Sequence, residues 1–139
     1  MWKRIALAAV FVLLLSACAG QRANLDTNPA FSSHKYTSHD VVVQWTSAKT
    51  SNGLRVAGTV TNVRPDLPYT SFELIAKLIG EDGKVIGSQR HAIVGRFVGS
   101  EPFAMEFPLD PAQMPARLKF AYSYGTADDH FLKDFETVP

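Results

Sequence analysis

Strict alternation of apolar and polar side chains is clearest in residues 70–79. The apolar positions are Phe72, Leu74, Ala76 and Leu78, and the polar positions between them are Ser71, Glu73 and Lys77. A period of two places successive side chains on opposite faces of a β-strand. This segment is therefore predicted to be a strand with one buried face, since a slip of one residue would turn the apolar set into water.

Shorter β-branched or alternating runs predict further strands on both sides of this segment. The expected strands are residues 41–46, 54–62, 89–98, 103–109 and 118–124. Turn signals rich in Gly, Asn, Asp and Pro fall at residues 51–53, 64–68, 81–83, 99–102 and 125–129. About seven or eight short strands with such spacing predict an all-β sandwich, with an open barrel as the alternative architecture.

Two later segments leave their structure open. Pro108, Pro111 and Pro115 bracket a loop or a single helical turn around residues 112–114. Residues 130–138 carry Phe131, Leu132 and Phe135, a spacing compatible with an edge-like strand or with a short amphipathic helix.

The first residues follow the pattern of a secretory signal. Lys3 and Arg4 form a basic start, and residues 5–15 are an apolar run of eleven residues. A membrane-spanning helix needs about 20 apolar residues. A signal peptide is therefore favoured over a short single-span anchor.

The residues that end this run hold the only cysteine of the chain. Leu15-Ser16-Ala17-Cys18 resembles the lipobox of bacterial lipoproteins, in which a branched apolar residue and two small ones precede a cysteine. The resemblance implies that residues 1–17 are a signal peptide, that a diacylglycerol is attached to Cys18, and that the new amino terminus is acylated, for example with palmitate. Two or more acyl chains hold a soluble domain stably on a bilayer. The alternative is an ordinary signal peptide with an incidental cysteine.

The residue after the cysteine bears on sorting. In the Gram-negative scheme that this motif resembles, Ala19 rather than aspartate implies the outer membrane, with the protein facing the periplasm.

Removal of residues 1–17 would leave 122 residues, the size of one domain. Residues 18–39 are predicted to form the lipidated cysteine and a flexible tether, of which residues 31–36 are candidates to dock on the fold, and residues 40–139 the sandwich domain. The mature chain would carry 12 basic and 13 acidic residues, a net charge of −1. A near-neutral chain suggests no nucleic-acid partner.

A second resemblance covers residues 56–107. The order of Gly58-Thr59-Val60-Thr61-Asn62, Leu74-Ile75-Ala76-Lys77-Leu78, Asp82-Gly83-Lys84 and the Pro-Phe-x-x-x-Phe of residues 102–107 is similar to the FxLYD class of immunoglobulin- and fibronectin-type domains. The sequence departs from that class where Leu78-Ile79-Gly80 stands in place of Leu-Tyr-Asp. The resemblance implies an immunoglobulin/fibronectin-like antiparallel β-sandwich of about seven strands, used in bacterial envelopes for binding or structure.

Candidate chemistry is sparse. The weak metal candidates are His91, Asp128 and His130, and no metal site or other cofactor is expected from them. No nucleophile motif, phosphate loop or zinc-protease motif occurs, so no enzyme is expected. Phe120, Tyr122 and Tyr124 are predicted core residues, and Trp45 and Tyr69 are the candidates for an exposed contact patch.

The sequence therefore predicts a membrane-anchored envelope lipoprotein whose β-sandwich binds or scaffolds an envelope protein or a cell-wall component. The alternative is a periplasmic metal- or small-ligand-binding protein. A cell-wall hydrolase is a third and weaker hypothesis, because the sequence has no nucleophile beside a base.

Overall fold

The structure is a computed structural model that describes residues 22–139. The signal peptide and Cys18, both expected from the sequence, lie outside the described residues. Residues 22–139 form the strands β1 (Asn24–Leu25), β2 (His34–Thr37), β3 (Val41–Thr50), β4 (Gly53–Asn62), β5 (Tyr69–Gly80), β6 (Val85–Phe97), β7 (Ser100–Pro108), β8 (Pro115–Gly125) and β9 (His130–Thr137).

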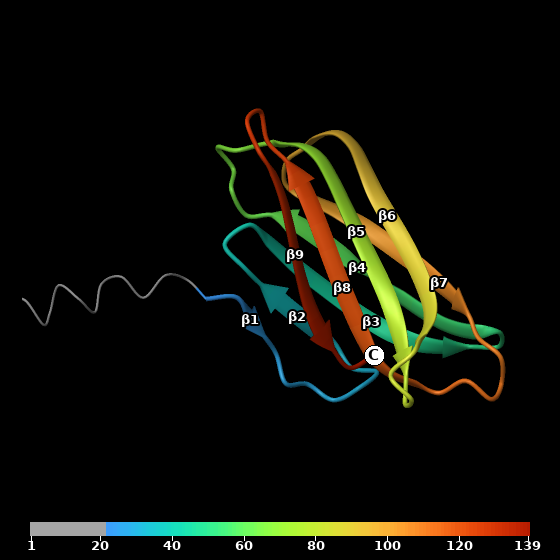
Figure 1. The fold of residues 1–139 in the computed structure, drawn as a ribbon. Coiled ribbons are helices and arrows are strands. Elements are labelled where there is room, and N and C mark those ends of the chain that lie inside the picture. The colour runs from blue at the N-terminus through green and yellow to red at the C-terminus, as the bar shows by residue number, and fades with distance from the viewer. Residues whose placement is uncertain (1–21) are drawn as a thin grey trace, which may run out of the picture.

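These strands make two antiparallel sheets that pack face to face (Figure 1). One sheet has the order β1-β2-β3-β4-β7 and the other the order β6-β5-β8-β9. If β3 is counted as the first strand, the first, second and fifth strands (β3, β4 and β7) share one sheet. The other four (β5, β6, β8 and β9) share the second sheet. A constant-type immunoglobulin domain differs only in placing its fourth strand in the first sheet. The predicted immunoglobulin/fibronectin-like sandwich is confirmed, and the barrel alternative is wrong.

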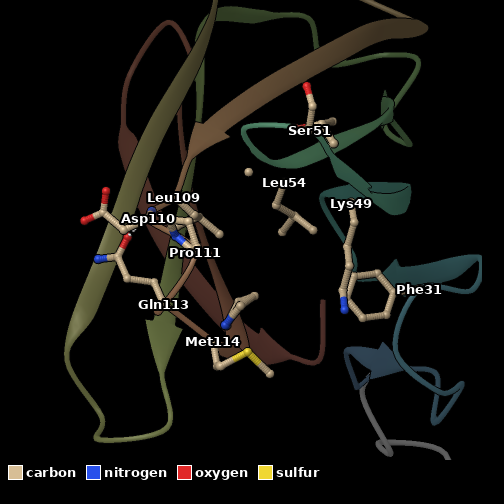
Figure 2. A pocket seen from close by; sticks show the side chains of 12 residues that line it. Phe31, Lys49, Ser51, Leu54, Leu109, Asp110, Pro111, Gln113 and Met114 are labelled. Carbon is tan, nitrogen blue, oxygen red and sulfur yellow. Dashed lines mark hydrogen bonds between the residues drawn. The ribbon is translucent and has the colours of Figure 1, made fainter.

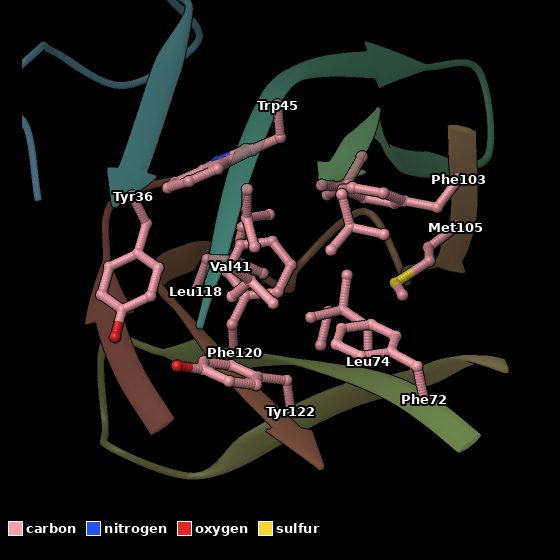
Figure 3. Close-up of a cluster of buried hydrophobic side chains, with 14 of the residues drawn as sticks. Tyr36, Val41, Trp45, Phe72, Leu74, Phe103, Met105, Leu118, Phe120 and Tyr122 are labelled. Atoms are coloured by element: carbon pink, nitrogen blue, oxygen red, sulfur yellow. The ribbon is translucent and has the colours of Figure 1, made fainter. Parts of the chain in front are cut away.

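Alternation along the strands explains which side chains form the core. In β5 the predicted inward positions are buried, and the same period holds in β3, β4, β7 and β8. The first sheet contributes Val41, Val43, Trp45, Leu54, Val56, Val60, Phe103, Met105 and Phe107, and the second contributes Phe72, Leu74, Ala76, Leu78, Leu118, Phe120, Tyr122 and Tyr124. Figure 3 shows members of both sets, among them Trp45 and Phe103 from the first sheet and Phe72 and Phe120 from the second, meeting between the two layers. Within residues 22–139, the core thus lies between the two sheets.

Several sequence-based boundaries need correction. Residues 130–137 are a strand at the edge of the second sheet, so the helix alternative is wrong. Pro102 lies inside β7 rather than in a turn, because β7 is an edge strand on which a missing N–H donor is tolerated. Residues 109–114 form a loop without a helical turn.

The segment predicted to be a tether is partly built into the sandwich. β2 pairs with β3, for example His34 with Trp45, and β1 pairs with β2. Tyr36 lies buried against Phe135 of β9, with ring centroids 3.8 Å apart. The expectation that residues 31–36 dock on the fold is therefore confirmed, because the aromatic side chain of Tyr36 fills the side of the core next to β9. The tether prediction needs correction at Asn24–Leu25, which form strand β1.

The sandwich has two ends. The Asp40 end carries the connections at residues 38–40, 63–68, 98–99 and 126–129, and the chain enters β1 there because Asn24 pairs with Thr37. The Lys49 end carries the connections at residues 51–52, 81–84 and 109–114. Phe31 also lies at the Lys49 end, where its ring is beneath the Lys49 ammonium.

Candidate functional site

A pocket of about 330 Å³ opens at the Lys49 end (Figure 2). Three segments far apart in the sequence enclose it: the loop before β2 with Phe31, the β3–β4 hairpin, and the β7–β8 loop. Its lining residues are Phe31, Lys49, Thr50, Ser51, Gly53, Leu54, Leu109, Asp110, Pro111, Gln113, Met114 and Pro115. The volume falls at the lower end of the range of about 300–1,000 Å³ typical of small-molecule sites.

Hydrogen bonds hold the loops that form the rim. The Leu109 N–H donates to the Asn52 carbonyl at 2.9 Å, which ties the β7–β8 loop to the β3–β4 hairpin. Within the loop, the Gln113 N–H donates to the Asp110 carbonyl and the Asp110 N–H donates to Gln113 Oε1, both at 2.9 Å. The rim is therefore held in place by hydrogen bonds between and within its loops.

The wall next to β2 is also held in place. The Phe31 N–H donates to the Pro139 carbonyl at 2.7 Å, and Phe31 has a φ of 61°, a left-handed conformation that is uncommon for a bulky side chain. The ring of Phe31 lies under the Lys49 ammonium, with Nζ 5.3 Å from the ring centroid. Such a cation–π contact orients Lys49 at the pocket mouth.

A second polar site is buried at the Asp40 end. Asp40 is 2 % exposed, and its carboxylate accepts hydrogen bonds from Tyr124 Oη at 2.7 Å and from Lys133 Nζ. Its backbone carbonyl accepts a hydrogen bond from Tyr69 Oη at 2.8 Å. Tyr122 Oη lies 3.2 Å from Ser38 Oγ in the same region. This network ties the β2–β3 connection to β5, β8 and β9.

The network shifts the titration of its members. Burial alone would raise the pKa of Asp40, but the hydrogen bonds from Lys133 and Tyr124 outweigh it and hold that pKa below its ordinary value. Burial, together with the nearby Asp40 charge, raises the pKa of Tyr69 to about 12. Burial and the hydrogen bond to Asp40 also raise the pKa of Tyr124. At neutral pH the network thus holds one charged carboxylate and neutral tyrosines, an arrangement that supports structure.

A third polar cluster lies where β2 meets β3. His34 is buried, its Nδ1 is 2.9 Å from Asp26 Oδ1, and its ring stacks on Trp45 with centroids 5.3 Å apart. Burial opposes ionisation of Asp26, but hydrogen bonds from His34 and from the Lys35 and Asn28 N–H groups lower its pKa overall. Within residues 22–139, no hydrogen-bond partner is present for His34 Nε2, Trp45 Nε1 or Ser47 Oγ.

The two residues proposed for an exposed patch are instead core residues. Trp45 is 2 % exposed and Tyr69 is fully buried, so neither is available as a surface contact. Trp45 shares the inward parity of Val41 and Val43, and Tyr69 is turned inward by a register shift between Tyr69 and Ser71. The expectation that Phe120, Tyr122 and Tyr124 are core residues is confirmed.

The metal candidates are not brought together. His91 lies on β6, whereas Asp128 and His130 lie at the β8–β9 turn, and β6 and β9 are opposite edges of one sheet. Among the described residues, no three His, Cys, Asp or Glu side chains gather as a metal-binding group. Nor does the described part of the chain hold a helix long and apolar enough to cross a bilayer.

The fold and the pocket define an antiparallel β-sandwich of the immunoglobulin/fibronectin-like class with a loop-lined pocket at one end. No family model matches this chain, and no curated protein or solved structure matches it. The pocket was not foreseen in the sequence, because its walls come from three separated segments whose side chains carry no motif.

Proposed function

We propose that this chain is a lipoprotein of the bacterial cell envelope, acylated at Cys18, whose β-sandwich binds or scaffolds an envelope protein or a cell-wall component. The observation that carries the proposal is the lipobox-like Leu15-Ser16-Ala17-Cys18 placed only five residues before β1. If the host is Gram-negative, Ala19 favours the outer membrane, with the sandwich in the periplasm.

The short connection has a geometric consequence. Residues 19–23 span at most about 3.6 Å each, so the sandwich would lie within roughly 20 Å of an acylated Cys18. The chain enters β1 at the Asp40 end. The Asp40 end would therefore lie nearer the bilayer, and the Lys49 end with its pocket would be directed toward the periplasm.

Metabolic labelling with palmitate tests the anchor. The full-length chain is expected to incorporate the label and to fractionate with membranes, and Cys18→Ala should lose both properties because the thiol is the attachment point. Ala19→Asp is the matched control, since it keeps the cysteine and should keep the label while changing the membrane of residence. Equal labelling of the Cys18→Ala variant would refute the anchor.

Loops at one end of a rigid sandwich are common binding surfaces, and the hydrogen-bonded rim of the pocket fits that role. A photo-cross-linking side chain at Met114, in the rim, is expected to capture a partner in living cells. The same group at Asp66, an exposed loop residue at the Asp40 end, is the control. Capture from position 66 alone would place the binding surface at the Asp40 end and would contradict a binding role for the pocket.

The small-ligand alternative is supported by one observation, the pocket itself. Its metal version has no support in the placement of its candidates, because His91 lies at the opposite edge of the sheet from Asp128 and His130. Titration of the protein with divalent metal ions tests that version, and binding abolished by His130→Ala would favour it.

A further inference from the structure

The interior of the pocket at the Lys49 end is largely apolar. Leu54 closes its floor and is 1 % exposed, while Leu109, Pro111 and Met114 form the wall opposite Phe31 (Figure 2). Met114 is 57 % exposed and Phe31 43 %, so two large apolar side chains stand open to solvent at the same mouth. An open apolar cavity with such a rim gains free energy when a hydrocarbon group displaces its water.

One positive charge stands at this mouth. Lys49 extends from β3 along the Phe31 ring, and among the described residues its ammonium takes part in no ion pair. Asp110 also lines the pocket, but Figure 2 shows its carboxylate turned to the side away from Lys49. Lys49 is therefore the charged side chain that a ligand head group would meet beside the Phe31 ring.

We propose that this pocket binds an anionic amphiphile, with an acyl chain against Leu54, Leu109 and Met114 and its carboxylate or phosphate head group at Lys49. Apolar walls favour the chain, and the ammonium favours a negative over a positive head group. The inference goes beyond the proposed function, because binding at this pocket would stand whether or not Cys18 is acylated.

The Lys49 charge and the apolar walls of the pocket contribute separately to the binding free energy. The wall residues contribute in proportion to the apolar area that the chain covers, whatever the charge of its head group. Lys49 contributes only to the difference between head groups of opposite sign. A pair of ligands with one chain and opposite charges therefore distinguishes this pocket from non-specific hydrophobic adsorption.

Residues 22–139 hold the two sheets and the hydrophobic core packed between them, so this domain is used without acyl chains or a bilayer that would absorb the probe. Dodecanoate and dodecyltrimethylammonium are titrated below their micelle concentrations, with binding followed by calorimetry and by amide chemical shifts. Dodecanoate is expected to bind at one equivalent and about tenfold more tightly than the cation. Dodecyl phosphate should bind about as tightly as dodecanoate if the site recognises the negative charge rather than the geometry of a carboxylate.

Two variants and one control complete the experiment. Lys49→Glu should reverse the order of the two ligands, and Met114→Asn, which removes apolar wall without adding charge, should weaken both; each position is exposed, so the fold is expected to persist. Lys77→Glu makes the same charge change on the outer face of β5 and should leave both affinities within about twofold. Equal affinities for the two ligands, or amide shifts centred away from residues 49–54 and 109–115, would overturn the proposal.

Discussion

Tyr124 of β8 donates its hydroxyl to Asp40 Oδ1 at 2.7 Å, across the 84 residues that separate them in the chain. The other carboxylate oxygen accepts from Lys133 of β9. Asp40 lies just before β3, so this one buried carboxylate joins the first sheet to both strands at one side of the second sheet. Because a buried charge is costly unless it is paired and hydrogen-bonded, the three side chains depend on one another.

Asp40→Asn is expected to destabilise the domain by about 2–3 kcal/mol, because Lys133 loses its charged acceptor and faces an amide. Denaturant unfolding of the two proteins measures the difference. Asp134→Asn is the matched control, since Asp134 pairs with Lys119 on the exposed face and should matter by less than about 1 kcal/mol. Equal losses for the two variants would mean that the buried network adds nothing.

The lowered pKa of Asp40 also predicts an acid dependence. A carboxyl whose pKa is lower in the folded than in the unfolded state stabilises the fold fully above the ordinary value, here 3.8. That contribution is lost as the pH falls through the folded-state pKa. As the pH is lowered from about 6 to about 2, the free energy of unfolding should therefore fall less steeply for Asp40→Asn than for the unchanged protein. Asp26, whose pKa is also lowered, supplies part of the remaining slope.

Much of the architecture could be predicted because it follows from local alternation. The inward set of β5 was visible in the sequence, and the hairpin at residues 51–53 follows from Asn52 and Gly53 between two apolar runs. Trp45 could have been placed in the core as well, since it shares the parity of Val41 and Val43. The apolar Val42 obscured that parity.

The rest depends on contacts that no local pattern shows. Tyr69 would face outward if the alternation from Phe72 continued, and only the register shift beside Ser71 turns it inward. In the sequence, Asp40 looks like an ordinary loop residue, because its partners Tyr124 and Lys133 lie in distant strands. His34 looks like a tether residue, because its partner Asp26 is met only across the short β1–β2 hairpin. The pocket likewise exists only once the loops of residues 29–33, 51–52 and 109–114 meet at one end.

The register of β5 predicts opposite outcomes for neighbouring positions. Leu74→Asp places an unpaired carboxylate at a fully buried site and should cost about 4 kcal/mol or more, a large fraction of the stability of an ordinary domain. Glu73→Ala removes a partly exposed pair with Arg90 and should change stability by less than about 0.5 kcal/mol. Thermal unfolding followed by circular dichroism checks both, and similar midpoints would show that the register is wrong.

Asp26 predicts a local rather than a global effect. Its carboxylate accepts from His34 and from the Lys35 and Asn28 N–H groups, all within the segment that adds β1 and β2 to the sheet. Asp26→Ala should therefore speed amide hydrogen exchange in residues 24–37 and leave β5 and β8 protected. Asp66→Ala, in the exposed loop between β4 and β5, is the control. Uniform loss of protection across both sheets would contradict a locally held segment.

Two glycines are needed for different reasons: Gly58 because two strands approach closely there, and Gly83 because of its backbone conformation. A Cβ at Gly58, which pairs with Trp45, would lie 1.8 Å from the Gln44 carbonyl oxygen, so Gly58→Ala forces β3 and β4 apart. Gly83 has a φ of +79° and open space around it, so Gly83→Ala meets only the left-handed penalty of about 1–2 kcal/mol. Denaturant unfolding should rank Gly58→Ala well below Gly83→Ala in stability. A Gly58→Ala protein as stable as the unchanged chain would show that the two strands do not approach this closely.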